Sequence, residues 1–155
     1  MPMSRGEPAL AAAQDRDGRW YVGTGLALLV PNSDGWSRLP WETIERATWD
    51  REHEQLVVVE TADFGHTEPT HRAALPQPEH LLELIRERVT ASIVVTVFEP
   101  VQGKRGITVA GRRSPHSDAE LVWSVVVDVG LDEQAAPVRA AAQRALAAAQ
   151  SEIGM

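Results

Sequence analysis

The chain has 155 residues, which is the size of one ordinary domain and enough to bury a single hydrophobic core. Hydrophobic residues make up 43% of the sequence and charged residues 24%, as in soluble globular proteins, and no apolar run reaches the roughly 20 residues that cross a bilayer. The net charge of −7 disfavours binding to nucleic acid or anionic lipid, because both attract clustered cations. Without cysteine, the chain has no disulfide, no thiolate metal site and no cysteine nucleophile.

Residues 1–16 are rich in alanine, proline and charge, show no clear periodicity, and predict a flexible leader. Their apolar stretch, residues 9–13, is too short for a secretory signal, so we expect a cytoplasmic protein. We expect residues 17–155 to form one α+β domain, with strands and a helix in 17–91 and three strands and a second helix in 92–155.

The first predicted strand covers residues 20–30, where Trp20, Val22, Thr24, Leu26, Leu28 and Val30 occupy one parity. The segment "PNSDG", residues 31–35, predicts a turn between two strands of a hairpin. Pro40 interrupts strand pairing, and Ile44 is out of phase with Trp49, so we expect a bend or bulge near residues 42–43.

The middle of the chain continues with strands and then a helix. A polar turn at 49–55 precedes a β-branched strand at 56–61, and residues 70–75 predict a short edge strand. The segment "PQPEHLLELIRERVTAS", residues 76–92, predicts a helix, with Pro78 in its first turn and Leu81, Leu82, Ile85 and Val89 at helical spacing.

Three strands and an alanine-rich helix are predicted after that. The strand at 92–101 is apolar on both faces, which is typical of a covered inner strand, and two more follow at 106–113 and 120–129. The helix covers about 137–153 and ends at Gly154, with an apolar stripe formed by Val138, Ala142, Ala145, Leu146, Ala149 and Ile153.

From Trp20 to about Val89 the pattern resembles the pleckstrin-homology-like and GRAM-like small β-barrels. The matching residues are Thr24 and Leu28–Leu29 in an early strand, then Pro40, Trp41 and Ile44 at a corner. The resemblance implies an antiparallel β-barrel or a strongly bent sheet with a helix that caps it. The chain as a whole also resembles a group of small actinobacterial proteins of unknown function, through "LPWETIERATWD", "RERVTAS" and "LVWSVVVDVGLD".

Two features depart from the pleckstrin-homology pattern. Three strands and a second helix follow the first helix, and the early segment "GTGLALLVPNSDG" lacks the lysines and arginines that phosphoinositide-binding members use. Lipid binding therefore does not follow from the resemblance, because a fold does not determine a function.

Three tryptophans within fourteen positions are the first candidate site. We expect Trp41 and Trp49 in the core, because exposed indoles would make a large apolar patch, whereas Trp36 beside a turn is open to either placement. If the corner binds a ligand or a partner, Trp36, Trp41 and Arg38 are the candidate residues.

Four cations are the second candidate. Lys104 and Arg105 are separated from Arg112 and Arg113 by a strand of roughly 23 Å at about 3.3 Å per residue, so we expect solvated basic turns at its two ends. The histidines His53, His66, His71, His80 and His116 have no helical metal spacing, and we expect neither a metal nor another cofactor.

No nucleophile elbow, P-loop, HExxH or dinucleotide motif occurs in the sequence, so we expect no catalytic residue and no enzyme. The sequence favours a non-enzymatic interaction or scaffold module that binds a protein partner or itself, with a homodimer among the expected forms. One alternative is a small-ligand binder or enzyme with a tryptophan-lined pocket. The other is a peripheral membrane-binding module that uses the "QGKRG" turn, although the net charge disfavours a membrane.

Overall fold

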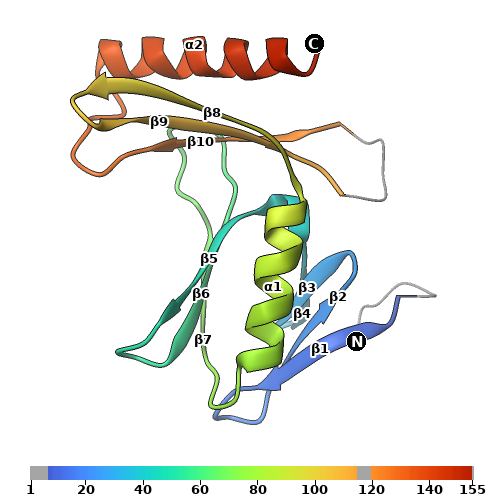
Figure 1. The fold of residues 1–155 in the computed structure, drawn as a ribbon. Helices are drawn as coiled ribbons and strands as arrows, with labels where there is room; N and C mark the ends of the chain where they lie inside the picture. Colours follow the sequence, from blue (N-terminus) through green and yellow to red (C-terminus); the bar gives the residue numbers. More distant parts are fainter. Residues whose placement is uncertain (1–6, 115–119, 155) are drawn as a thin grey trace.

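The computed structural model describes residues 7–114 and 120–154 of the chain, and these form an α+β structure with three antiparallel sheets (Figure 1). The sheets have the strand orders β1-β2-β3-β4, β5-β6-β7 and β10-β9-β8. The elements in chain order are β1 (Ala9–Gln14), β2 (Trp20–Thr24), β3 (Ala27–Asn32), β4 (Gly35–Pro40), the 3-10 turn η1 (Trp41–Thr43), β5 (Ile44–Asp50), β6 (Gln55–Glu60), β7 (Thr70–Ala74), α1 (Glu79–Ala91), β8 (Ile93–Gln102), β9 (Arg105–Arg112), β10 (Val122–Val127) and α2 (Ala136–Glu152).

The first lobe consists of β1 to β7 and α1, and we call it the N-terminal lobe. In Figure 1, α1 lies between the β1–β4 sheet and the β5–β7 sheet, where its buried residues Leu81, Leu84 and Ile85 join one core with Leu28, Trp41, Ile44 and Leu56. Helical spacing in the sequence predicted Leu81 and Ile85 on this face but not Leu84, and the predicted Leu82 and Val89 pack against the core while only partly buried. The two sheets remain separate, and no sheet closes into a barrel within the described ranges.

The second lobe, which we call the C-terminal lobe, consists of β8, β9, β10 and α2. Helix α2 lies along one face of this sheet (Figure 1), and its small residues Ala141, Ala145 and Ala149 are buried against Val95, Ile107 and Val109. The predicted stripe on α2 is therefore the face that packs on the sheet. Gly154 has φ +79° just after the helix, a left-handed conformation that suits its predicted place as a C-terminal cap.

Residues 9–14, predicted to belong to a flexible leader, instead form β1, which pairs with β2 from Ala9↔Thr24 to Gln14↔Trp20. Four of its six residues are alanines, which have no alternation in size or polarity that could announce a strand. Residues 1–6 of the predicted leader lie outside the described residues. The division into a leader and one domain remains a prediction.

The single strand predicted at residues 20–30 was wrong, because the chain reverses between β2 and β3. The Thr24 hydroxyl oxygen accepts hydrogen bonds from the backbone N–H groups of Leu26 and Ala27, both at 3.1 Å, and these bonds hold the reversal. Trp20, placed by its parity on a half-buried face, is 49% exposed. A threonine that bonds its own backbone therefore outweighed the alternating pattern.

The predicted turn at 31–35, the bend at residues 42–43 and the edge strand near residue 70 are confirmed. They correspond to the β3–β4 hairpin, to η1 and to β7, which lies at the edge of its sheet. The prediction of a covered inner strand at 92–101 was wrong. This segment is β8, an edge strand, and the inner strand of the sheet is β9.

Candidate functional site

One of the three tryptophans at the corner, Trp41, is fully buried in the core. Trp41 is 1% exposed, and its indole Nε1–H donates to the Thr24 carbonyl oxygen at 2.9 Å, which satisfies its polar atom inside the core. Trp49 packs against the same core while partly exposed, and Trp36 is also partly buried. Core placement is thus confirmed for Trp41, which cannot line an open binding pocket in this state.

Arg38 is held by a buried carboxylate. Its two terminal nitrogens donate to both oxygens of Glu7 at 2.9 and 2.8 Å, and the Thr24 hydroxyl donates to Glu7 at 2.8 Å. The hydrogen bond with Glu7 raises the pKa of Arg38 above its ordinary value. Because Arg38 is engaged and Trp41 is buried, the corner does not present Trp36, Trp41 and Arg38 as one exposed face.

The four cations lie at the two ends of β9, as their spacing predicted, but Arg112 is not in a solvated turn. Arg112 is buried within the strand, where it donates to the Ser124 hydroxyl at 2.8 Å and to the Glu45 carbonyl oxygen at 3.0 Å. Burial lowers its pKa. Lys104, Arg105 and Arg113 are exposed.

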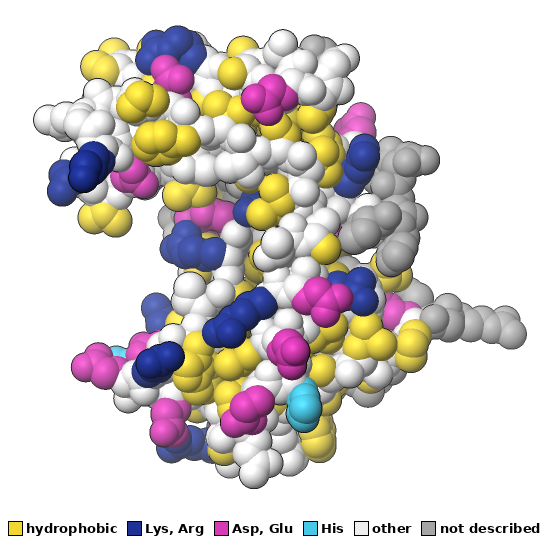
Figure 2. All heavy atoms as spheres, in the orientation of Figure 1, with side chains coloured by type: hydrophobic (Ala, Val, Ile, Leu, Met, Phe, Trp, Pro, Cys, Tyr) yellow, Lys and Arg dark blue, Asp and Glu magenta, His cyan; other side chains and the backbone are white. Residues whose placement is uncertain are grey.

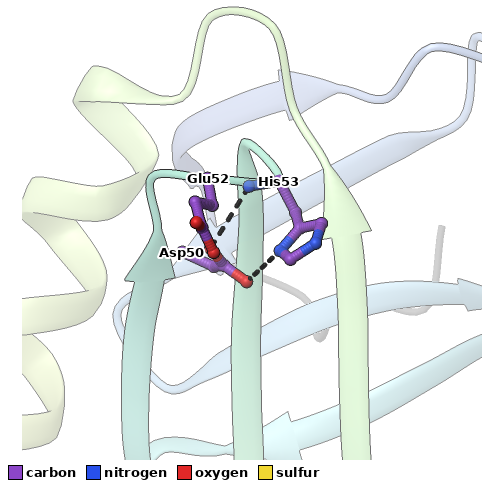
Figure 3. A group of neighbouring side chains, drawn as sticks. All are labelled: Asp50, Glu52 and His53. Carbon is purple, nitrogen blue, oxygen red and sulfur yellow. Dashed lines mark hydrogen bonds and ion pairs between the residues drawn. The ribbon is translucent and has the colours of Figure 1, made fainter.

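The turn between β5 and β6 brings together Asp50, Glu52 and His53, a group that the sequence reading did not single out (Figure 3). One Asp50 oxygen lies 2.8 Å from His53 Nδ1, and the other accepts the His53 backbone N–H at 3.2 Å. Hydrogen bonding to the His53 side chain lowers the pKa of Asp50. These contacts are those of an ordinary exposed turn. The three side chains are types that can bind a metal, but nothing else in the described structure marks them as a metal site.

A cavity of about 250 Å³ lies between the loop at residues 61–69 and the end of β10. Phe64, His66, Glu68 and Asp128 are among the side chains that line it, together with Arg46 from β5. Burial, together with the charge of Glu133, raises the pKa of Glu68. The approach of β10 to this loop could not be predicted from the sequence, because it depends on the packing of segments that are far apart in the chain.

Strand β8, at the edge of its sheet, has several exposed apolar side chains. Ile93, Val94 and Phe98 are 40%, 42% and 49% exposed, although all three belong to a regular strand. Among the residues that the structure describes, β9 is the only strand that pairs with β8. Figure 2 shows hydrophobic side chains on the face of this lobe, above the indentation that separates the two lobes.

The hydrogen bonds of β9 show which backbone groups of β8 point away from the sheet. The Gly106 N–H donates to the Asp128 carboxylate at 2.8 Å, and the Gly106 carbonyl accepts the Asp128 N–H at 3.0 Å. These groups point toward β10, so the backbone of Pro100, which pairs with Gly106, points away from β9.

The same alternation extends along β8. Phe98 and Thr96 have the parity of Pro100, so their N–H and C=O groups also point outward, whereas those of Val97 and Glu99 bond β9. A bulge at Ile93/Val95 and Pro100 itself bound this segment on its two sides. Thr96 and Phe98 are therefore the centre of an open strand edge. Pro100 was the one signal of an edge strand in the sequence.

None of the described helices is both long enough and apolar enough to span a bilayer. No protein-family model, curated protein or solved structure matches this chain.

Proposed function

We propose that this protein is a non-enzymatic interaction module that binds a protein partner, or a second copy of itself, by adding a strand to the edge of its C-terminal sheet. The observation that carries the proposal is the β8 edge, which joins exposed apolar side chains to outward backbone donors and acceptors in one segment. Such edges are the sites at which another extended chain pairs with a sheet.

Three further observations support this role over its rivals. A ligand pocket built on the tryptophan corner has little support, because Trp41 is buried and Arg38 is paired with Glu7. Membrane binding would depend on Lys104 and Arg105 at one turn, since the buried Arg112 cannot join them on the surface. The absence of catalytic motifs from the sequence also favours binding over catalysis.

The resemblance of residues 20–89 to pleckstrin-homology-like folds supports the same role by analogy. In both, antiparallel strands precede a helix that packs on them, as β2 to β7 precede α1 here. Folds of this type have many functions. The resemblance therefore supports a role in binding in general but does not indicate a specific ligand.

Photocrosslinking at β8 tests the proposal in cells of the native host. We would replace Phe98 with photoreactive p-benzoylphenylalanine and, as a matched control, replace Trp20, which is equally exposed but lies in the β1–β4 sheet. We expect a discrete adduct from position 98, lost when Thr96→Pro removes an outward N–H group. The absence of an adduct, or the same adducts from both positions, would contradict the proposal.

A further inference from the structure

We infer that the occupant of the β8 edge is the β8 strand of a second copy, paired antiparallel about a two-fold axis at Val97. The inference rests on the proposed function and names its partner. It would join two three-stranded sheets into one six-stranded sheet, in the order β10-β9-β8-β8-β9-β10 across the two copies, with both α2 helices on the same face.

The hydrogen-bonding pattern of the edge is complementary to itself in this register. When Val97 faces Val97 of the second copy, Thr96 lies opposite Phe98 on both sides of the axis. Both residues direct their N–H and C=O groups outward, so the two pairs exchange four backbone hydrogen bonds. Every outward donor in the regular part of β8 then has an acceptor.

The neighbouring registers fit less well. An axis at Phe98 would place Pro100 opposite Thr96, and the missing N–H of proline would remove a hydrogen bond from each of those pairs. An axis at Thr96 would place Phe98 opposite Val94, which lies at the bulge where the register of β8 with β9 shifts. With the axis at Val97, Pro100 lies opposite Val94, so the proline and the bulge fall at the ends of the paired segment, outside the two complete pairs.

The side-chain contacts and the spacing of charges are also compatible with a two-fold axis at Val97. Phe98 would pair directly with Thr96 of the second copy, whose side chain would cover part of the apolar surface near the Phe98 Cβ. Glu99, which is bonded to Arg144 of α2 at 3.0 Å, would face Val95. The two Glu99 carboxylates would stay about 13 Å apart along the strand, at about 3.3 Å per residue, so like charges do not meet.

The purified full chain tests the inference by sedimentation velocity up to about 1 mM, a range that detects even millimolar affinity. We expect a concentration-dependent dimer. Thr96→Pro removes an outward N–H group, and Phe98→Lys introduces a charge beside the axis. Each variant should therefore raise the Kd of the dimer by at least about tenfold. Trp20→Lys, an equally exposed site in another sheet, should leave it unchanged. A strict monomer, or a dimer that these edge variants do not weaken, would overturn the inference.

Single cysteines locate the axis, because the natural chain has none. Residues at Val97 would face each other as a non-hydrogen-bonded pair with Cα atoms about 4.5 Å apart, within the disulfide range, so Val97→Cys should oxidise rapidly to a covalent dimer. Thr96→Cys alone should react slowly, because its nearest copy is a diagonal neighbour about 7–8 Å away. A mixture of Thr96→Cys and Phe98→Cys should form the mixed dimer. Equal rates for Val97→Cys and Trp20→Cys would overturn the register.

The two proposals fail in different ways. If Phe98 crosslinks a different protein in cells while the purified chain remains monomeric, the interaction edge stands and self-pairing is wrong. If position 98 gives neither an adduct nor a dimer, both proposals are wrong.

Discussion

At the scale of single residues, the core stability of the N-terminal lobe depends on polar atoms that are satisfied where they are buried. Thr24 is the shared contact, since its hydroxyl bonds Glu7 and shapes the β2–β3 reversal while its carbonyl accepts the Trp41 indole N–H. Buried polar groups are tolerated only when they are bonded in this way. Substitutions at these residues should therefore lower the free energy of unfolding by more than the loss of buried apolar volume alone would predict.

Trp41→Phe should lower the free energy of unfolding by about 1–3 kcal/mol, because it removes the hydrogen bond to Thr24 and leaves unfilled space in a closed core. Urea unfolding followed by circular dichroism measures the change. Trp20→Phe is the matched control, and at this exposed site we expect a change within about 0.5 kcal/mol. Equal losses in the two variants would contradict a core role for Trp41.

Asp15 should make the stability of the fold depend on pH. Burial alone raises its pKa, but hydrogen bonds from the Arg19 and Asp17 backbone N–H groups and from the Arg19 side chain together outweigh burial and lower it. A lowered pKa stabilises the folded state above the unfolded value of about 3.9, and this contribution is lost as the pH falls through the folded pKa.

Asp15→Asn should therefore destabilise the protein at pH 7, and its difference from the parent should shrink as the pH falls below about 4. Urea unfolding at a series of pH values measures this, with the exposed Asp17→Asn as the control in the same loop. A difference that is independent of pH would show that Asp15 acts through its shape and not its charge.

At the scale of elements, close backbone contact sets the geometry of the β8–β9 pair. A Cβ at Gly106 would collide with the Glu99 carbonyl oxygen and would come within 2.8 Å of the Phe98 ring. The ring of Phe98 thus covers a position that only glycine can occupy without displacing β8.

Gly106→Ala should destabilise the protein by about 1–3 kcal/mol, because backbone atoms of β8 must move to accommodate the methyl group. Gly25→Ala is the control, since no heavy atom lies within 4 Å of its Cβ position, and we expect a change within about 0.5 kcal/mol. Thermal and urea unfolding compare the two. A neutral Gly106→Ala would mean that β8 is less closely packed on β9 than the structure shows.

At the scale of the whole molecule, the two lobes are connected by more than the chain between α1 and β8. The buried Arg112 of β9 donates to the Glu45 carbonyl of β5, across 67 positions of sequence, and to Ser124 of β10. The two terminal nitrogens of a planar guanidinium can bond both oxygens at once. A lysine has a single nitrogen and cannot reach both oxygens from the same position. The cation therefore acts as a clamp between the lobes.

Arg112→Lys should lower the free energy of unfolding by about 1–3 kcal/mol, because at least one buried oxygen loses its partner. The neighbouring Arg113→Lys, on an exposed residue, should have little effect on the urea midpoint. Equal midpoints for the two variants would contradict the role of Arg112 as a clamp.

The sequence predicted well wherever a residue's neighbours along the chain decide the structure. The helical spacing of Leu81 and Ile85, the turn at residues 31–35 and the small-residue stripe of α2 were all correctly placed, because periodicity and turn chemistry are local. It failed at β1, whose alanines carry no pattern, and at Thr24, whose side chain reverses the chain in competition with strand propensity.

The candidate edge could be predicted only in part. Apolar residues on both faces of 92–101 are expected of an inner strand, yet β8 lies at the edge with one face covered by α2. How many partners a strand has depends on segments far away in the sequence, and Pro100 was the only local sign. In the same way, spacing alone located Arg112 at the far end of β9, but its burial depends on β5 and β10.

Patterns along the chain were enough to predict the α+β class, the two helices and most of the strands, because these depend on contacts between near neighbours in the chain. Two features could not be predicted from local pattern: Arg112 is buried where it links the lobes, and β8 is left at an open edge. Both depend on which distant elements pack together, and packing is a property of the assembled chain rather than of any segment.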